Sequence, residues 1–150
     1  MIIDYVDTVS VDYILDRLSE KNIQELEIIY GGDFKNIVRC EILSSVCSSN
    51  MNVVKLDDNT PVAITGLLPI NDDTAALFFL HTEDLQLLPK LQFIKQSIKK
   101  MKKWRELYNQ TFTASIYKEN TSVMKWVSLL GFKRITDDVT PDFKMFELTK

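Results

Sequence analysis

The spacing of hydrophobic residues changes several times along the chain, and each change marks a new element. Four segments place apolar residues three or four positions apart, which is typical of helices with one buried face. The clearest is 88–108, where an apolar series from Leu87 to Tyr108 predicts one continuous buried stripe. The predicted helices cover 11–30, 33–46, 88–108 and 120–130.

Between these helices the spacing shortens to that of strands, with turn residues at 57–60 and 69–73. The predicted strands cover 2–6, 52–56, 62–68, 75–80, 111–117, 132–136 and 143–149. The 75–80 segment is entirely apolar, which favours a central strand covered on both faces. The resulting order, β-α-α-β-β-β-α-β-α-β-β, predicts an α/β (α+β) fold in which helices cover a mixed sheet.

Length and charge narrow the class of protein. The 150 residues contain no repeat or Pro/Ser-rich linker, so we expect a single domain over 1–150. Eighteen basic against 21 acidic residues give a net charge of −3, which favours neither nucleic acid nor an anionic membrane as partner. The N-terminus lacks the basic region of a secretory signal, and the apolar run 74–81 is too short to span a bilayer. We therefore expect a cytoplasmic protein that does not enter membranes.

Glycine is scarce, and this excludes two common nucleotide sites. The chain has four glycines, whereas average usage of roughly 7% would give about ten. No two of them form a G-x-G, so neither a dinucleotide-binding fingerprint nor a P-loop is present. Gly31 and Gly131 each follow a predicted helix and are expected to end it.

Cysteine and histidine are also too few for the usual zinc sites, and we expect no metal. Cys40 and Cys47 lie two helical turns apart, about 10 Å along one predicted helix, too far for a disulfide. We interpret both as small core residues of a reducing compartment. His81 is the single imidazole; it lies at the end of the apolar strand 75–80, where it is either a site residue or an ordinary strand-end residue.

One segment resembles a known family. In 114–132, Asn120 begins a predicted helix, Val123 follows three residues later, and Leu130-Gly131-Phe132 closes the helix and opens the next strand. An Asn at this position is expected to cap free helix N–H groups with its side chain. The arrangement resembles the late strand–helix unit of GNAT-type N-acetyltransferases, and the hairpin from Asp58 to Gly66 resembles an earlier part of the same fold. Within that superfamily the chain looks most similar to the acetyltransferase-like and internal virion proteins of tailed phages.

The resemblance implies a mainly antiparallel sheet and transfer of an acetyl group from acetyl-CoA to an amine, on a small molecule or a protein. Leu80, His81, Thr82 and Asn120 fall where the family binds this donor, with a backbone N–H near Leu80 or His81 facing the acyl oxygen. Glu83 is then a candidate base, although an exposed loop or helix-cap acid is the simpler interpretation of this residue.

Two departures from the family pattern bear on activity. The segment 81–91 occupies the place of a glycine loop that holds the pyrophosphate, yet it has no glycine and contains two carboxylates. Val127 stands where the family often has a Tyr that protonates the leaving thiolate, and Tyr117 is the nearby substitute unless it simply fills a strand position. The alternative function is therefore a catalytically degenerate structural or partner-binding protein, with a phage or host protein as partner and the virion as a second location.

The helix at 88–108 carries seven cations, and two interpretations remain open. The first is a solvated face opposite the apolar stripe; the second is a surface for the phosphates of coenzyme A. A nucleic-acid role is disfavoured because no aromatic residues alternate with the cations. The cations are Lys90, Lys95, Lys99, Lys100, Lys102, Lys103 and Arg105.

Overall fold

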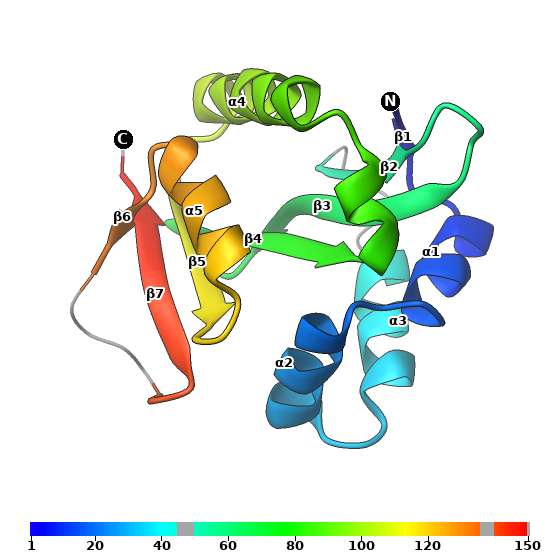
Figure 1. Cartoon of the computed structure of the whole chain (residues 1–150). Coiled ribbons are helices and arrows are strands. Elements are labelled where there is room, and N and C mark those ends of the chain that lie inside the picture. The colour runs from blue at the N-terminus through cyan, green and yellow to red at the C-terminus, as the bar shows by residue number, and fades with distance from the viewer. Residues whose placement is uncertain (45–49, 136–139, 150) are drawn as a thin grey trace. The chain divides into compact units, whose positions relative to one another are not determined.

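A computed structural model of the chain describes residues 1–44, 50–135 and 140–149 (Figure 1). Its strands are β1 (Ile2–Tyr5), β2 (Met51–Lys55), β3 (Pro61–Pro69), β4 (Thr74–His81), β5 (Thr111–Tyr117), β6 (Lys133–Arg134) and β7 (Phe143–Leu148). In the described residues these seven strands form one sheet in the order β1-β2-β3-β4-β5-β7-β6. β1 with β2, β2 with β3, β5 with β7 and β6 with β7 pair antiparallel, whereas β4 and β5 run parallel. The mixed, mainly antiparallel sheet is as predicted.

The helices confirm the predicted order, except that two helices occupy the predicted helix 11–30 and one short helix at 83–87 was not predicted. They are α1 (Thr8–Leu15), α2 (Glu20–Tyr30), α3 (Phe34–Ser44), the short 3-10 helix η1 (Glu83–Leu87), α4 (Lys90–Leu107) and α5 (Thr121–Leu129). The predicted helix 33–46 extends at its end into residues outside the described ranges. The predicted strand 132–136 is represented by β6, and part of it also lies outside those ranges.

The chain folds into two compact units. The first contains Met1–Leu67 and Phe78–Leu88, and the second contains Leu68–Leu77 and Pro89–Lys150. Strands β3 and β4 each begin in one unit and end in the other. The first unit therefore holds α1, α2, α3, η1 and the carboxyl end of β4, while the second holds α4, α5 and the last three strands.

In the first unit, the predicted helix 11–30 is wrong in one respect, because two helices occupy this region. Helix α1 ends at Leu15, and α2 begins after Ser19, whose hydroxyl accepts a hydrogen bond from the Asn22 N–H at 3.3 Å. Between them, Leu18 forms an isolated β-bridge with Thr82. A Ser N-cap starts a new helix readily, and Ile14 in α1, Leu18 within the break and Leu26 in α2 are all buried. Hydrophobic spacing alone cannot distinguish this arrangement from one long helix.

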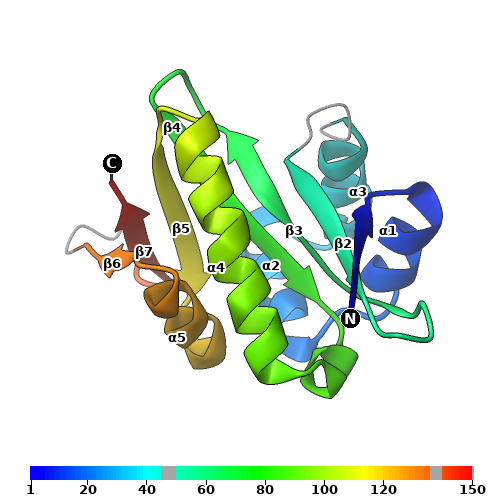
Figure 2. The same cartoon turned by 90° about the horizontal axis from the view of Figure 1, so that it is seen from above.

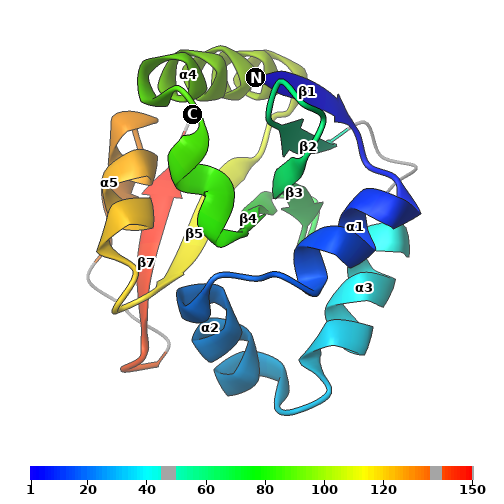
Figure 3. The same cartoon turned by 45° about the vertical axis from the view of Figure 1, so that its right-hand side comes forward.

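Helix α3 packs beside α1 in the same unit (Figure 3). Its buried face consists of Phe34, Val38 and Ile42, which are spaced four residues apart. The prediction that Cys40 is a core residue is wrong: it lies two residues from Val38, about 200° around the helix, and is exposed. Its predicted companion, Cys47, lies outside the described residues.

In the second unit, α4 and α5 lie side by side (Figure 2). Phe93 and Trp126 stack with ring centroids 5.8 Å apart, and the Trp126 indole N–H donates to the Ser97 hydroxyl at 3.1 Å. The predicted continuous buried stripe of α4 is wrong over its first half, since Leu91 is 74% exposed and only Met101 and Trp104 are buried on this helix.

Two glycines have structural roles that no other residue fills well. Gly131 follows α5 with a φ of +99°, a left-handed conformation that ends the helix as predicted. Gly66 lies in β3 opposite Met51, and a Cβ atom there would meet the Asn50 carbonyl oxygen at 2.4 Å. The early hairpin therefore depends on the absence of a side chain at position 66.

Candidate functional site

The carboxyl end of β4 carries three of the predicted site residues. Leu80 and Thr82 are buried, and His81 between them is half-buried. The Thr82 N–H donates to the Val62 carbonyl oxygen of β3 at 2.9 Å. Because backbone groups alternate in direction along a strand, the N–H and C=O of His81 point away from β3. They are therefore available to another partner.

Their partners are Ser19, the N-cap of α2, and Asn22 in the first turn of that helix. The His81 N–H donates to Asn22 Oδ1 at 2.9 Å, and the His81 carbonyl oxygen accepts from the Ser19 N–H at 2.9 Å. Ser19 also donates its hydroxyl to Asn22 Oδ1 at 3.2 Å. Ser19 and Asn22 are 2% and 1% exposed, so these bonds form a polar cluster that is closed to solvent. This cluster fastens α2 to the end of β4.

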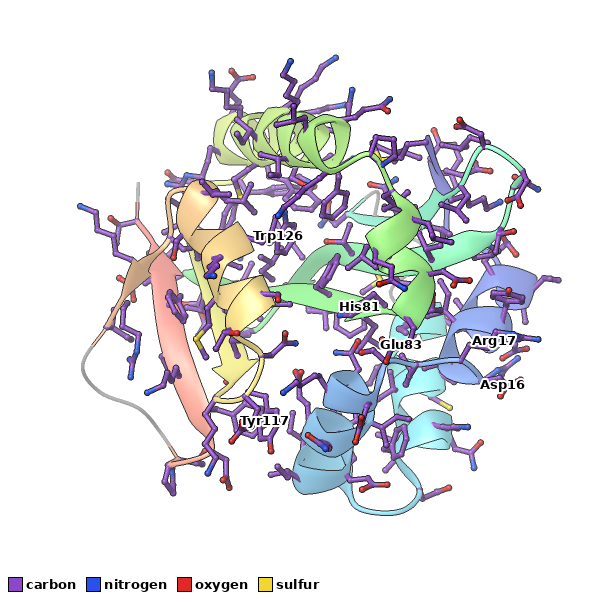
Figure 4. The ribbon with its side chains drawn as sticks, in the orientation of Figure 1. Asp16, Arg17, His81, Glu83, Tyr117 and Trp126 are labelled. Atoms are coloured by element: carbon purple, nitrogen blue, oxygen red, sulfur yellow. The ribbon has the colours of Figure 1, made fainter. Side chains whose placement is uncertain are left out.

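Glu83 lies one residue beyond Thr82 and is exposed. Its Oε1 accepts a hydrogen bond from the Glu20 N–H at 3.0 Å, which places a carboxylate at the N-terminus of α2. A negative charge there is favoured by the helix dipole and by the unpaired N–H groups of the first turn. The structure therefore gives Glu83 a capping role, and its assignment as a base stays a prediction. Figure 4 shows Glu83 near His81, with Asp16 and Arg17 on the segment after α1.

The imidazole of His81 has defined surroundings. Its Nδ1 lies 2.9 Å from the Thr82 carbonyl oxygen, and its ring lies 5.4 Å from that of Phe79. A carbonyl oxygen can only accept, so this contact assigns the proton to Nδ1 and leaves a lone pair on Nε2. Burial lowers the pKa of His81 from its ordinary 6.5, although the Thr82 contact and the charge of Glu83 oppose that change. The ring is therefore neutral at pH 7.

Glu25 is a residue that the sequence analysis missed. It lies one turn after Asn22 on α2 and is half-buried. Burial raises the pKa of Glu25 from 4.5 to about 7, while a hydrogen bond from the Asn22 side chain opposes the rise. A carboxylate with this pKa can both accept and release a proton near neutrality. The sequence offers one indirect signal for Glu25, the helix start at Ser19-x-x-Asn22. This pattern predicts where α2 begins, but it does not predict which side chains of α2 are buried.

The second unit holds the other predicted site residues. Tyr117 ends β5, and its ring lies 6.0 Å from that of Phe143 on the paired strand β7. Asn120 precedes α5 and is 6% exposed. The prediction that its side chain caps this helix is wrong, because Asn120 bonds through its backbone instead: its N–H donates to the Tyr117 carbonyl oxygen, and its carbonyl oxygen accepts from Met124. The backbone at Asn120, with φ −92° and ψ 65°, departs from the extended conformation usual at capping residues.

A coenzyme A diphosphate needs several backbone N–H donors, and the two candidate segments differ in this respect. In η1 the N–H groups of Asp84, Leu85 and Leu88 already donate to Thr82 Oγ1, the Thr82 carbonyl and the Leu85 carbonyl. Helix α4 instead starts without a side-chain cap after Pro89, and its first turn contains Lys90 and no acid. The first N–H groups of a helix lack intrahelical acceptors. The start of α4 therefore has no side-chain cap on its first N–H groups, whereas the N–H groups of η1 named above are already bonded.

The cations of α4 mostly lie on its solvated face. Lys90, Lys95, Lys99, Lys102 and Lys103 are exposed, as the first of the two interpretations predicts. Arg105 differs, because its guanidinium donates to the Gln110 carbonyl oxygen and lies 4.7 Å from the Phe112 ring centroid. Arg105 therefore stabilises contacts within the second unit.

The described residues contain neither a metal-binding cluster nor a helix suited to a bilayer. No group of three or more His, Cys, Asp or Glu side chains in these residues is arranged to hold a metal ion. Within the same part of the chain, no helix combines the length and the apolar composition needed to cross a membrane.

Solved structures share this fold over nearly the entire chain. PH1933 from Pyrococcus horikoshii OT3 is 17% identical, with a TM-score of 0.69 over 99% of this chain and 98% of that one. A spermidine N-acetyltransferase from Vibrio cholerae, in complex with CoA and spermine, is 10% identical, with a TM-score of 0.68 over 98% and 94%. A GNAT-family acetyltransferase from Bacillus anthracis is 13% identical, with a TM-score of 0.63 over 97% and 90%.

Sequence comparison gives no match: no protein-family model fits the chain, and no curated protein is similar enough in sequence. The structural likeness confirms the predicted GNAT fold. At these identities it concerns the fold alone, since one fold can carry different functions.

Proposed function

We propose that the protein is a GNAT-type N-acetyltransferase that transfers the acetyl group of acetyl-CoA to an amine. The observation that carries the proposal is the fold shared over 98% of this chain with an enzyme bound to CoA and spermine. The start of α4 supports it, because Lys90 and the first backbone N–H groups of that helix fit a diphosphate. Since β3 and β4 pass through both units, we propose that 1–150 acts as one domain.

In the proposed reaction, the amine nitrogen attacks the thioester carbonyl carbon, a C–N bond forms and the C–S bond breaks. A carboxylate takes the proton that the ammonium group loses, and the departing sulfur receives a proton. A backbone N–H at Leu80 or His81 is the proposed donor to the acyl oxygen, and Asn120 is a proposed acetyl-CoA-binding residue. Tyr117 is the proposed proton donor to sulfur.

Two carboxylates of the first unit are candidates for the base. Glu83 is the candidate from the sequence, and it is held at the start of α2 by the Glu20 N–H. Glu25 is the candidate from the structure, because a pKa of about 7 suits a base that works near neutral pH. Both carry negative charge in their ionised form, which favours a cationic amine such as a polyamine as the acceptor.

The first experiment measures binding. Isothermal titration of the purified chain with CoA and with acetyl-CoA is expected to show saturable heat for both. Absence of heat for both ligands at high micromolar protein overturns the proposal. Replacing Lys90 with Glu is expected to weaken the binding of both ligands about equally. Lys102→Glu, an exposed change late in the same helix, serves as the matched control.

The second experiment measures turnover. Release of the CoA thiol from acetyl-CoA is followed with spermidine, a monoamine and no amine, and is expected to require an amine. Glu25→Gln and Glu83→Gln then separate the two candidate bases: the true base variant loses most of kcat and its pH dependence near neutrality. Tyr117→Phe is expected to lower kcat without changing CoA affinity.

A partner-binding protein without turnover is the second candidate function. One observation favours it: the His81 N–H, a proposed acyl-oxygen donor, is already bonded to Asn22. Saturable CoA binding with no amine-dependent thiol release supports this candidate. The relation to tailed-phage proteins, a phage or host protein partner, and a cytoplasmic or virion location all stay proposals that rest on the 114–132 segment.

A further inference from the structure

The end of β4 carries a backbone N–H that two different acceptors can use. In the structure this donor, at His81, is bonded to Asn22 Oδ1 at 2.9 Å. In the proposed reaction a backbone N–H at the same strand end faces the acyl oxygen. One N–H makes one strong, well-aligned hydrogen bond, so Asn22 and an acyl oxygen exclude one another at this position.

The Asn22 side chain is held in the competing position by several neighbours. Its Oδ1 also accepts the Ser19 hydroxyl at 3.2 Å, and its backbone N–H donates to the same hydroxyl. With 1% of the residue exposed, the amide has no bulk water to replace these bonds. Asn22 is therefore a fixed acceptor rather than a side chain that happens to point at His81.

Neighbouring contacts keep the segment on the strand end independently of Asn22. The Ser19 N–H donates to the His81 carbonyl oxygen, Leu18 bridges to Thr82, and the Glu20 N–H donates to Glu83. Removal of the Asn22 amide therefore leaves three attachments of this segment to 81–83. The Asn22 side chain can therefore be substituted, which frees the His81 N–H, while α2 stays attached to the end of β4.

We propose that Asn22 competes with the acyl carbonyl oxygen for the His81 N–H, and thereby reduces the preference of the site for acetyl-CoA over free CoA. The proposal rests on the acetyltransferase function proposed above. Free CoA has no acyl oxygen, so the competition affects acetyl-CoA alone. Asn22 is a specificity-determining residue in this sense, and it does not need to touch the amine.

The test compares the two ligands in matched variants. Asn22→Ala removes the acceptor, and Asn22→Asp keeps an oxygen in nearly the same place. In Asn22→Ala, the ratio of the Kd for CoA to the Kd for acetyl-CoA is expected to rise about 2- to 12-fold over wild type, the range for one net hydrogen bond. In Ser19→Ala, which leaves the Asn22 bond to His81 intact, the ratio is expected to stay near the wild-type value, and in Asn22→Asp, where a carboxylate oxygen accepts at least as strongly as the amide oxygen, it is expected not to rise.

A second measurement uses the wild-type chain, so that it does not depend on the variant folding. Amide NMR signals of His81 and of the Asn22 side chain are followed during titration with each ligand. They are expected to move more with acetyl-CoA than with CoA, because only acetyl-CoA displaces the Asn22 oxygen.

The outcomes separate the two proposals. An unchanged ratio in folded Asn22→Ala, or equal NMR shifts with both ligands, overturns the competition and leaves the acetyltransferase proposal standing. If wild type binds neither ligand, the acetyltransferase proposal fails and the competition fails with it. A higher ratio together with unequal shifts supports both.

Discussion

Replacing Glu25 with Gln should make the protein more stable in neutral and alkaline solution but not in acid. Burial raises the pKa of Glu25 from 4.5 to about 7. At about 1.4 kcal/mol per pKa unit, the ionised carboxylate costs about 3 kcal/mol in the folded state. Because the side chain is half-buried and solvent screens part of this cost, we expect about 1–3 kcal/mol.

The sign follows from the proton balance. Below about pH 4.5, Glu25 is neutral in both the folded and the unfolded chain and contributes nothing. As pH rises from 4.5 to 7, the unfolded chain releases this proton while the folded chain keeps it, so the free energy of unfolding falls. Above pH 7 the loss is complete and constant. The amide side chain of the Glu25→Gln variant does not titrate. The free energy of unfolding of the variant therefore rises above that of wild type only as pH rises from 4.5 to 7.

The measurement is urea unfolding followed by far-UV circular dichroism at pH 4.5, 6 and 8. The difference between Glu25→Gln and wild type is the quantity of interest, because His81, whose pKa is lowered and which acts in the opposite direction, is present in both proteins and cancels. Glu27→Gln, an exposed change on the same helix, is the control and should alter stability by less than about 0.5 kcal/mol at each pH. A Glu25→Gln difference that is the same at pH 4.5 and pH 8 would refute the reasoning.

Two further substitutions test the fold around the site. Gly66→Ala should destabilise the chain by about 1–3 kcal/mol, since a Cβ would lie 2.4 Å from the Asn50 carbonyl oxygen and 2.6 Å from Met51 Cγ. Gly32→Ala, with nothing within 4 Å, should be nearly neutral, and equal urea midpoints for the two variants would contradict this account. Glu83→Ala should lower stability by about 0.5 kcal/mol through loss of the carboxylate at the start of α2, and the loss should shrink in high salt. A salt-independent effect would point to another cause.

The features that the sequence predicted correctly are those encoded by a few adjacent residues. Gly31 and Gly131 both adopt positive φ after a helix, as their position implied. The turn at 57–60 closes with the Leu56 N–H on the Thr60 carbonyl oxygen and with Asn59 at a φ of +74°. Local conformational preference decides each of these, so a single sequence suffices.

The candidate site was harder to predict because its chemistry depends on contacts between distant segments. Asn22 and His81 are 59 positions apart, and neither residue type indicates that an amide oxygen meets that particular N–H. Glu25 lies on the same helix as Glu27, and only its burial in the fold distinguishes it from that exposed residue. Hydrophobic spacing also concealed the start of α2, because the buried residues Ile14, Leu18 and Leu26 keep a helical spacing from α1 through the break into α2.

The bonds of Asn22 explain why a competition at His81 can be closely balanced. An amide oxygen accepts two hydrogen bonds, and Asn22 Oδ1 accepts them from Ser19 and His81. If an acyl oxygen takes the His81 N–H, Asn22 keeps the Ser19 hydroxyl, so no buried group is left without a partner. Exchange of one neutral hydrogen bond for another changes the free energy little.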